Sequence, residues 1–247
     1  MRLELEFELM QKELPKDNKS IWISFLKNVL SVCNEGKFYE QYFSGTEEKD
    51  YTFSILLSKP QFVEEKVLLD STRVKMIFSA DDRKRTGLIF FSAFIQAKGQ
   101  KFPLPNGNSM VLRRIRQLQE QLVTSSKIIC KTVVGGGLVV REHDKETNRD
   151  KYYTFQDAEF EEKLKTVLKV QAEKAGFTGR IADTIKITAI QCKKILVKFY
   201  NVYVDCTAGV FQMEGDTSLL QYFYQAGMAS RHSAGFGMID IISQENE

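Results

Sequence analysis

The stretch QAGMASRHSAGFGMIDIIS, from Gln225 to Ser243, combines three glycines with an arginine and one of the two histidines of the chain. Glycine tolerates positive φ and lets another backbone approach closely, so such a cluster marks either a tight connection or a ligand cradle. In a cradle, Arg231 and the backbone amides from Ser230 to Gly237 could receive phosphate groups. The alternative is architectural: the glycines pack a connection between a helix and a strand, and Arg231 is solvated.

The other histidine, His143, lies beside Arg141 in the segment VVREHDKETNRD. Histidine titrates near neutral pH, so an exposed imidazole next to an arginine suits proton transfer, but the pattern is equally typical of a charged surface turn. Two basic stretches lie on predicted strands: one contains Lys193, Lys194 and Lys198, and the other contains Arg113, Arg114 and Arg116. Such stretches usually form solvated faces, but these two could line a groove.

Composition places the 247 residues among ordinary globular proteins, with 43% hydrophobic and 27% charged residues. The net charge of +3 does not demand a polyanionic partner. Four scattered cysteines without CxxC pairing argue against a structural zinc site or a disulfide framework, and we expect no metal or cofactor. No apolar run is long enough to cross a bilayer and MRLELEFELM is no signal peptide, so we expect a cytoplasmic protein with no membrane partner.

The hydrophobic pattern predicts two successive units of the order β-α-β-β-α-β. In the first unit, strands are predicted over 3–9, 51–58, 66–80 and 108–119, and helices over 19–32 and 86–98. In the second unit, strands are predicted over 126–134, within 187–215 and over 237–243, with a hairpin of charged tip at 137–155. Its helices are predicted over 157–174 and from Thr217, which we expect to cap the last helix.

Two split β-α-β units predict an α+β fold of two tandem ferredoxin-like (RRM-like) domains with antiparallel sheets. We expect an N-terminal domain over 1–125 and a C-terminal domain over 126–247, which carries the glycine-rich loop 227–237. One larger α+β domain is the alternative. The fold hosts many unrelated activities and does not decide function, although paired sheets suit the binding of RNA.

The glycine-rich stretch resembles the signature of the CRISPR-associated repeat-RNA-processing endoribonucleases, which belong to the RAMP superfamily. That signature is Gly-hydrophobic-Gly, five residues, and Gly-hydrophobic-Gly, between the last helix and the last strand of a second ferredoxin-like domain. Here it reads GMA at 227–229 and GFG at 235–237, with Ala229 in place of a glycine. YTFS at 51–54 and VVREHDKETNRDKYYTF resemble two further segments of the family, so the resemblance covers essentially the whole chain.

The resemblance implies metal-independent cleavage of precursor CRISPR RNA within its repeats. The ribose 2′-hydroxyl attacks the adjacent phosphate and leaves a 5′-hydroxyl and a 2′,3′-cyclic phosphate or 3′-phosphate. Such a reaction needs a base, an acid and groups that stabilise the charge on the phosphate. The implied partner is CRISPR repeat RNA; a CRISPR effector complex is a further candidate, and both a monomer and a homodimer stay open.

The family commonly places its catalytic histidine after the first helix, where this chain reads NEGKFYEQYFSGTEEKDYTFS without a histidine. Tyr42 lies nearest to that place with Tyr39 close by, and Lys49 falls where a helper lysine is expected. A Tyr/Lys pair could supply a proton and stabilise charge, although unperturbed tyrosine titrates about three units above neutral pH. Packing against the sheet is the alternative for both tyrosines. His143 is our first choice for a displaced acid or base.

RNA contacts are expected mainly from the glycine-rich loop and from basic residues of the second unit. The candidates are Ser230, Arg231, His232, Gly235, Gly237, Arg141, Lys193 and Lys194. A noncatalytic RNA-binding member of the same superfamily is the second hypothesis, because the expected histidine is absent. The third is an unrelated protein whose glycine loop binds a nucleotide, which is disfavoured because the loop follows a helix and precedes a strand.

Overall fold

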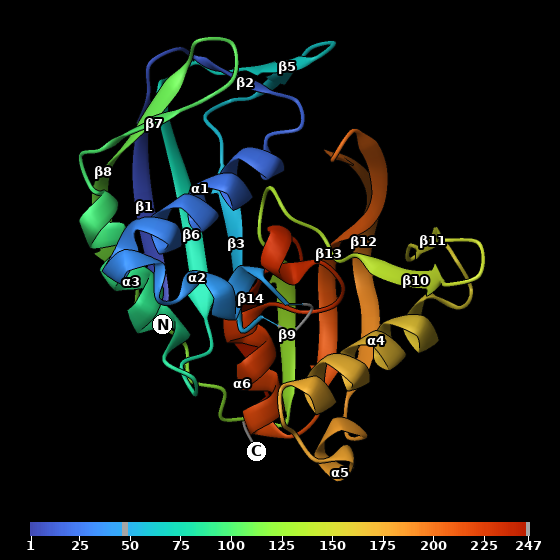
Figure 1. The fold of residues 1–247 in the computed structure, drawn as a ribbon. Coiled ribbons are helices and arrows are strands. Elements are labelled where there is room, and N and C mark those ends of the chain that lie inside the picture. Colours follow the sequence, from blue (N-terminus) through green and yellow to red (C-terminus); the bar gives the residue numbers. More distant parts are fainter. Residues whose placement is uncertain (46–48, 246–247) are drawn as a thin grey trace.

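Two antiparallel sheets lie side by side in the computed structural model of the chain, which describes residues 1–45 and 49–245 (Figure 1). The strand order is β3-β6-β1-β8-β7 in the first sheet and β12-β13-β9-β14 in the second. The first sheet contains β1 (Arg2–Leu9), β3 (Tyr51–Leu56), β6 (Arg73–Ala80), β7 (Lys101–Pro103) and β8 (Ser109–Gln117). The second contains β9 (Lys127–Thr132), β12 (Lys186–Phe199), β13 (Val202–Glu214) and β14 (Ile239–Gln244).

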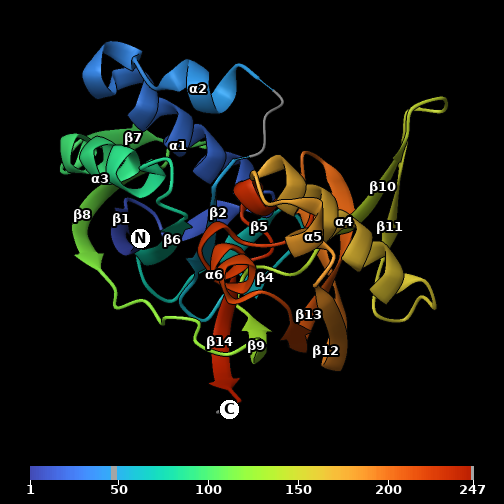
Figure 2. The same cartoon turned by 90° about the horizontal axis from the view of Figure 1, so that it is seen from below.

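Helices cover one face of each sheet: α1 (Lys19–Val32) and α3 (Thr86–Ala97) the first, and α4 (Phe160–Lys174) and α6 (Thr217–Ala226) the second (Figure 2). With β7 set aside, both sheets have the order second, third, first and fourth strand. This repeated order confirms the predicted α+β fold of tandem ferredoxin-like units, which we call the N-terminal and C-terminal units. No sheet strand lies between 118 and 126, and the domain boundary at residue 125 stays a prediction.

Several smaller elements are added to the two sheets and their covering helices. They are the 3-10 helix η1 (Cys33–Gly36), α2 (Tyr39–Phe43), a small sheet of β2 (Glu13–Pro15), β4 (Gln61–Phe62) and β5 (Lys66–Leu68), the hairpin of β10 (Val140–Asp144) and β11 (Arg149–Tyr153), α5 (Gly179–Ala182) and the 3-10 helix η2 (His232–Ala234). None of the described helices is long and apolar enough to cross a membrane.

The apolar periodicity of the chain explains why these elements form and pack. The apolar residues of α1 at three- and four-residue spacing, such as Trp22, Phe25 and Val29, are buried against the first sheet. One predicted detail is wrong: Asp216 caps α6 in place of Thr217, because its carboxylate accepts a hydrogen bond from the Ser218 amide at 2.9 Å. Thr217 is instead the first residue of the helix.

The edge strand β3 joins the two units, because its first four residues all contact the C-terminal unit. Nδ1 of His232 lies 3.1 Å from the backbone carbonyl oxygen of Tyr51. The Thr52 hydroxyl donates a hydrogen bond to the carbonyl oxygen of Phe236 at 2.9 Å, and this bond is buried. The segment YTFS is therefore the strand on which the glycine-rich loop docks.

The next two residues of β3 continue this contact. The ring of Phe53 lies so close to Gly235 that a Cβ atom added there would be 2.7 Å from it. The Ser54 hydroxyl donates to the carbonyl oxygen of Val134 at 2.5 Å. The Phe53 ring and Lys19 Nζ leave no room for a side chain at Gly235, which also has a φ of +85°.

Lys19, the first residue of α1, reaches into the same joint. Its side chain is 5% exposed, and Nζ donates to the carbonyl oxygens of Gly135 at 3.1 Å and Gly235 at 2.5 Å. Burial lowers the pKa of Lys19 from 10.5 to about 8, and a small opposing effect comes from Cys206. This ammonium group therefore loses its proton more easily in the folded chain than in the unfolded chain.

This shift predicts a specific pH dependence of stability. Between about pH 8 and 10.5 the unfolded chain binds the Lys19 proton and the folded chain releases it, so the free energy of unfolding rises with pH. The rise amounts to up to about 3 kcal/mol, and below about pH 8 both states are protonated and this contribution is flat. Denaturant titrations of wild type and Lys19→Met at several pH values isolate it as their difference. A difference that does not change with pH would contradict the prediction.

Candidate functional site

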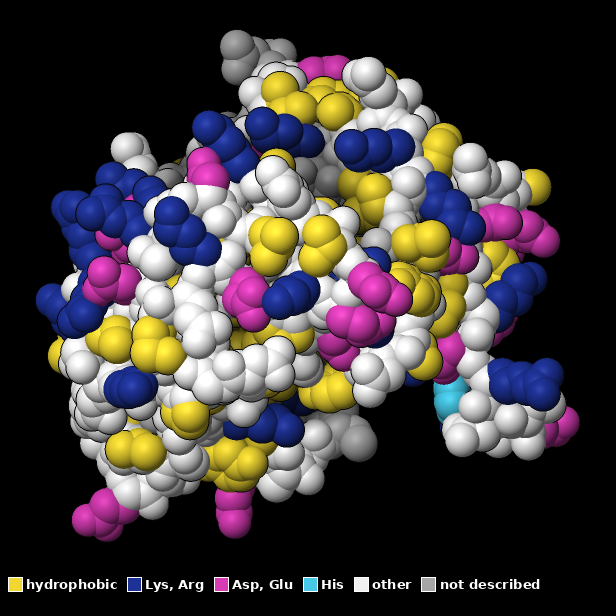
Figure 3. Space-filling model, turned by 90° about the horizontal axis from the view of Figure 1, so that it is seen from above, with side chains coloured by type: hydrophobic (Ala, Val, Ile, Leu, Met, Phe, Trp, Pro, Cys, Tyr) yellow, Lys and Arg dark blue, Asp and Glu magenta, His cyan; other side chains and the backbone are white. Residues whose placement is uncertain are grey.

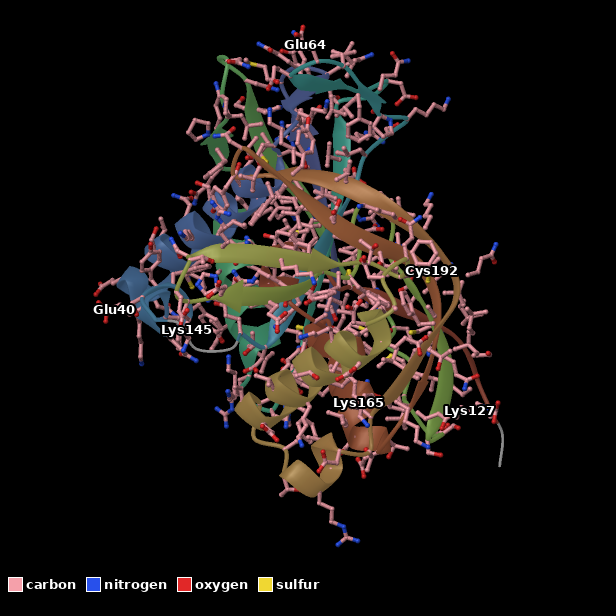
Figure 4. All side chains as sticks on the ribbon, turned by 90° about the vertical axis from the view of Figure 1, so that its right-hand side faces the viewer. Glu40, Glu64, Lys127, Lys145, Lys165 and Cys192 are labelled. Carbon is pink, nitrogen blue, oxygen red and sulfur yellow. The ribbon has the colours of Figure 1, made fainter. Side chains whose placement is uncertain are left out.

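The β10–β11 hairpin places four polar side chains on one face. Its register pairs His143 with Asp150 and Arg141 with Tyr152. Because residues two apart in a strand point to the same face, all four side chains share it. Figure 4 shows the hairpin extended across this side of the molecule, with Lys145 at its tip.

Asp150 is the centre of this group and also binds the glycine-rich loop. Nδ1 of His143 lies 2.8 Å from Oδ1 of Asp150, and Arg141 donates to both carboxylate oxygens at 3.2 Å. The Tyr152 hydroxyl donates to Oδ2 at 3.1 Å. Arg231 donates from Nη2 to Oδ2 at 3.1 Å and to the Tyr152 hydroxyl at 3.0 Å. We call these five residues the Asp150 cluster; it brings together three residues predicted from sequence, His143, Arg141 and Arg231.

The charges of the Asp150 cluster keep its carboxylate ionised and leave the cluster with a net positive charge. Burial raises the pKa of Asp150, but hydrogen bonds from His143 and Arg141 and the charge of Arg141 outweigh it and lower this pKa to about 2. One carboxylate then faces two guanidinium groups, and the net positive charge suits a phosphate. Since a carboxylate only accepts, Nδ1 of His143 carries the hydrogen and Nε2 is left for a substrate. The His143 side chain is 38% exposed.

Besides its hydrogen bond to Asp150, Arg231 is positioned by its backbone conformation and by a contact with the Phe199 ring. Its φ is 61°, in the left-handed region, where it precedes η2. The guanidinium carbon lies 5.2 Å from the centre of the Phe199 ring, a cation–π contact. The Arg231 side chain is 24% exposed, so it is fixed by the protein and still reaches the surface.

The amides of the glycine-rich loop are largely occupied within the protein. The amides of Ser230, Gly235 and Gly237 donate to the carbonyl oxygens of Val139, His232 and Gly137 at 2.9, 3.1 and 2.9 Å. Contact of these amides with phosphate stays a prediction, and it would require those hydrogen bonds to open. The bonds favour the architectural interpretation of the glycines, but Arg231, which that interpretation left solvated, is bonded to Asp150 and Tyr152.

His232 lies inside the protein, although its position in the loop predicted contact with RNA. The side chain is 2% exposed, and Nδ1 lies 2.9 Å from the carbonyl oxygen of Ala226 as well as 3.1 Å from that of Tyr51. Both neighbours are acceptors, so Nδ1 carries a hydrogen. The imidazole thus ties the loop to β3 and does not reach the surface.

The candidate catalytic residues that follow the first helix are not part of the β10–β11 hairpin. Tyr42, in α2, is 4% exposed, and its hydroxyl donates to Thr86 Oγ1 at 3.0 Å. Burial raises the pKa of Tyr42 in spite of the Thr86 hydrogen bond, which disfavours it as a proton donor. Tyr39 is half-buried and packs on Phe43 at a centroid distance of 5.6 Å. Lys49 is half-buried and lies two residues before β3.

The two predicted basic clusters are partly neutralised. Lys193 and Lys194 are neighbours on β12 and point to opposite faces; Lys194 pairs with Asp205 at 3.0 Å, whereas Lys193 lines a hollow of about 530 Å³ on the second sheet. In the first sheet, two arginines pair with glutamates of β1: Arg113 with Glu8 at 2.7 Å, and Arg116 with Glu4 at 3.1 Å. Figure 3 shows the same mixing of acidic and basic side chains on the face seen from above.

Cysteines and metal ligands form no cluster in the part of the chain that the structure describes, where no group of three His, Cys, Asp or Glu side chains could hold a metal ion. Cys33, Cys130 and Cys206 are buried and Cys192 is half-buried, all as free thiols. Burial raises the pKa of Cys130 and Cys206 to about 12, so both stay protonated.

Asp150 and Tyr152 were missed by the sequence analysis. They belong to the quoted segment VVREHDKETNRDKYYTF, but neither residue type stands out in a charged hairpin. The signal was available in the hairpin itself, because a tip at 145–148 pairs His143 with Asp150 across the strands. The approach of Arg231 could not be read in this way, since it comes from a loop far along the chain.

Gly237 provides a direct test of how tightly the loop is packed. Its φ is +64°, and a Cβ atom added there would lie 1.9 Å from the carbonyl oxygen of Met228. Gly99 is a matched control, since it has a φ of +81° and no atom within 4 Å of such a Cβ. Gly99→Ala should cost about 1 kcal/mol of stability, from the left-handed backbone alone.

Gly237→Ala should instead lower the free energy of unfolding by about 4 kcal/mol or more, because the clash is with backbone and cannot relax cheaply. Denaturant or thermal unfolding of the two variants measures the contrast. Equal losses of stability in both variants would show that the loop is not packed as described.

Comparison with known proteins identifies relatives over the whole chain. Residues 118–241 match the family model described as CRISPR associated protein Cas6, C-terminal. The whole chain is 23% identical to CRISPR-associated endoribonuclease Cas6 1 of Methanocaldococcus jannaschii, of which the match covers 95%.

Two solved structures are similar in fold. One, from a Cas6-related gene of Pyrococcus furiosus, has a TM-score of 0.82 at 18% identity and 99% coverage of each chain. The other, described as a RAMP protein binding different RNA substrates, has a TM-score of 0.79 at 18% identity, with 98% of this chain and 100% of that chain covered. These similarities agree with the tandem ferredoxin-like architecture.

Proposed function

The chain belongs to the Cas6 family of CRISPR-associated proteins, and we propose that it is a metal-independent endoribonuclease that cuts precursor CRISPR RNA within its repeats. The observation that supports this proposal is the Asp150 cluster, which presents one histidine and two arginines on a partly exposed face. In the proposed reaction, the 2′-hydroxyl oxygen bonds to the adjacent phosphorus and the bond to the 5′ oxygen breaks. The products carry a 5′-hydroxyl and a 2′,3′-cyclic phosphate, which can open to a 3′-phosphate.

Each member of the cluster has a role in this proposal. His143 acts through Nε2 on one of the two proton transfers, either from the 2′-hydroxyl or to the leaving 5′ oxygen. Asp150 holds the imidazole in one tautomer and stabilises its protonated form, as a carboxylate does behind a catalytic histidine. Arg231 and Arg141 stabilise the negative charge that gathers on the phosphate in the transition state.

The difference in burial supports His143 over Tyr42 in this proposal. The hydroxyl of Tyr42 is held by Thr86 inside the protein, whereas the imidazole of His143 is open to solvent. The other proposed RNA contact is Lys193, because it lines the hollow on the open face of the second sheet. Contacts of this kind position the RNA through its phosphates.

His143→Ala should slow single-turnover cleavage of repeat RNA by about 10² to 10⁴-fold, since a proton-transfer group is lost. Binding of an uncleavable repeat RNA should change little, because Arg231 and Arg141 remain. Tyr42→Phe is the matched comparison; it should keep the cleavage rate and lose about 1 kcal/mol of stability with the Thr86 hydrogen bond. Loss of cleavage in Tyr42→Phe with full cleavage in His143→Ala would contradict the assignment.

A second candidate function is a noncatalytic member of the family that only holds repeat RNA. The observation that favours it is the site after the first helix, where Tyr42 is buried and no histidine is present. Under this alternative, Arg231→Ala weakens RNA binding and the wild-type protein does not cut. Cleavage by the wild-type protein that depends on His143 would exclude it.

A further inference from the structure

Lys19 is a buried ammonium group that forms no ion pair with any described carboxylate. Its hydrogen bonds go only to backbone carbonyl oxygens, those of Gly135 and Gly235. This position is unfavourable for a charge, because burial removes its hydration and because the first turn of a helix carries partial positive charge. An apolar side chain would fill the space without this free-energy penalty. The reason for a lysine at this position therefore lies in the two backbone segments that it joins.

The two carbonyl groups come from separate segments of the C-terminal unit. Gly135 follows β9, and Gly235 follows η2. Both segments press against β3: a Cβ atom at Gly135 would lie 2.4 Å from the carbonyl oxygen of Ile55, and one at Gly235 would meet the Phe53 ring. One ammonium group of the N-terminal unit therefore bridges two backbone segments of the other unit, which only a side chain with several donors can do.

A continuous row of contacts leads from Lys19 to the Asp150 cluster. Nζ lies 4.5 Å from the centre of the Phe236 ring. Phe236 packs edge-to-face on Phe199 at a centroid distance of 5.5 Å. Phe199 also contacts the guanidinium group of Arg231, which donates to Asp150.

A second contact holds the same joint. The carboxylate of Asp17, two residues before Lys19, accepts a hydrogen bond from the backbone amide of Asn201 at 3.1 Å. Asn201 lies in the turn that follows Phe199. The start of α1 thus contacts both the glycine-rich loop and the turn after Phe199, whose ring lies against Arg231.

We propose that Lys19 is a positioning residue for RNA binding and cleavage: it fixes the glycine-rich loop and Phe236, so that the Phe199 ring holds the Arg231 guanidinium toward the phosphate. Lys19 itself does not touch the RNA. This inference rests on the proposed function, in which Arg231 binds the phosphate.

A double-mutant cycle tests the proposal with Lys19→Met, Arg231→Ala and the two combined. The readout is the Kd for a labelled repeat RNA whose 2′-hydroxyls are methylated, so that it cannot be cut. Lys19→Met should weaken binding about tenfold when Arg231 is present and less than about twofold in the Arg231→Ala background. Lys101→Met is the control, since it removes the same charge from an exposed residue of β7, at the opposite edge of the first sheet from β3, and should change the Kd by less than about twofold.

Hydrogen exchange supplies a readout that needs no RNA and separates local from global effects. In Lys19→Met, amides of the segment 233–238 should exchange faster, while those of α3 keep their wild-type rates. Unchanged loop exchange, or equal losses of affinity in both backgrounds, would overturn the role of Lys19. Absence of repeat-RNA binding by the wild-type protein would instead overturn the proposed function, and with it the part of the inference that concerns RNA.

Discussion

The structure depends on one contact, the docking of the glycine-rich loop against the edge strand β3. Side-chain and carbonyl groups of Tyr51, Thr52 and Ser54 bond to the C-terminal unit, and Phe53 covers Gly235. The approach is so close that Thr52 excludes a side chain at Gly227 and the Phe53 ring excludes one at Gly235. Since neither ferredoxin-like unit makes this surface alone, the docking sets where Arg231 stands relative to both sheets.

Asp150 links the docked loop to the hairpin in the proposed site. The carboxylate of Asp150 binds His143 and Arg141 of the hairpin and Arg231 of the docked loop. The positive groups keep it ionised, and it in turn binds the imidazole through Nδ1. The site is therefore assembled from two segments that are linked only when the loop is in place, and the buried contacts of His232 and Lys19 serve that purpose.

Local patterns predicted most of the fold. The periodicity of the segment 19–32 gave the bounds of α1, and the alternation of apolar residues indicated β1, because both patterns reflect burial of a single face. The cap of α6 was misplaced by one residue, since Asp216 and Thr217 are both good capping residues.

The site was only partly predictable. His143, Arg141 and Arg231 stand out by residue type, but the carboxylate that joins them depends on hairpin register and on a tertiary contact. His232 and Lys19 are buried, although a polar residue in a glycine loop and a lysine in a first turn normally face solvent. Tertiary hydrogen bonds to carbonyl groups of distant segments decide both cases, and no local pattern encodes them.

The central claim is that this site cuts RNA with the 2′-hydroxyl as nucleophile. The most direct measurement is incubation of the purified wild-type protein with end-labelled repeat RNA in excess EDTA, followed by analysis of the product ends. We expect one cut, with a 5′-hydroxyl on one fragment and a 2′,3′-cyclic phosphate or 3′-phosphate on the other. Tight binding without a cut, or products with a 3′-hydroxyl, would contradict it.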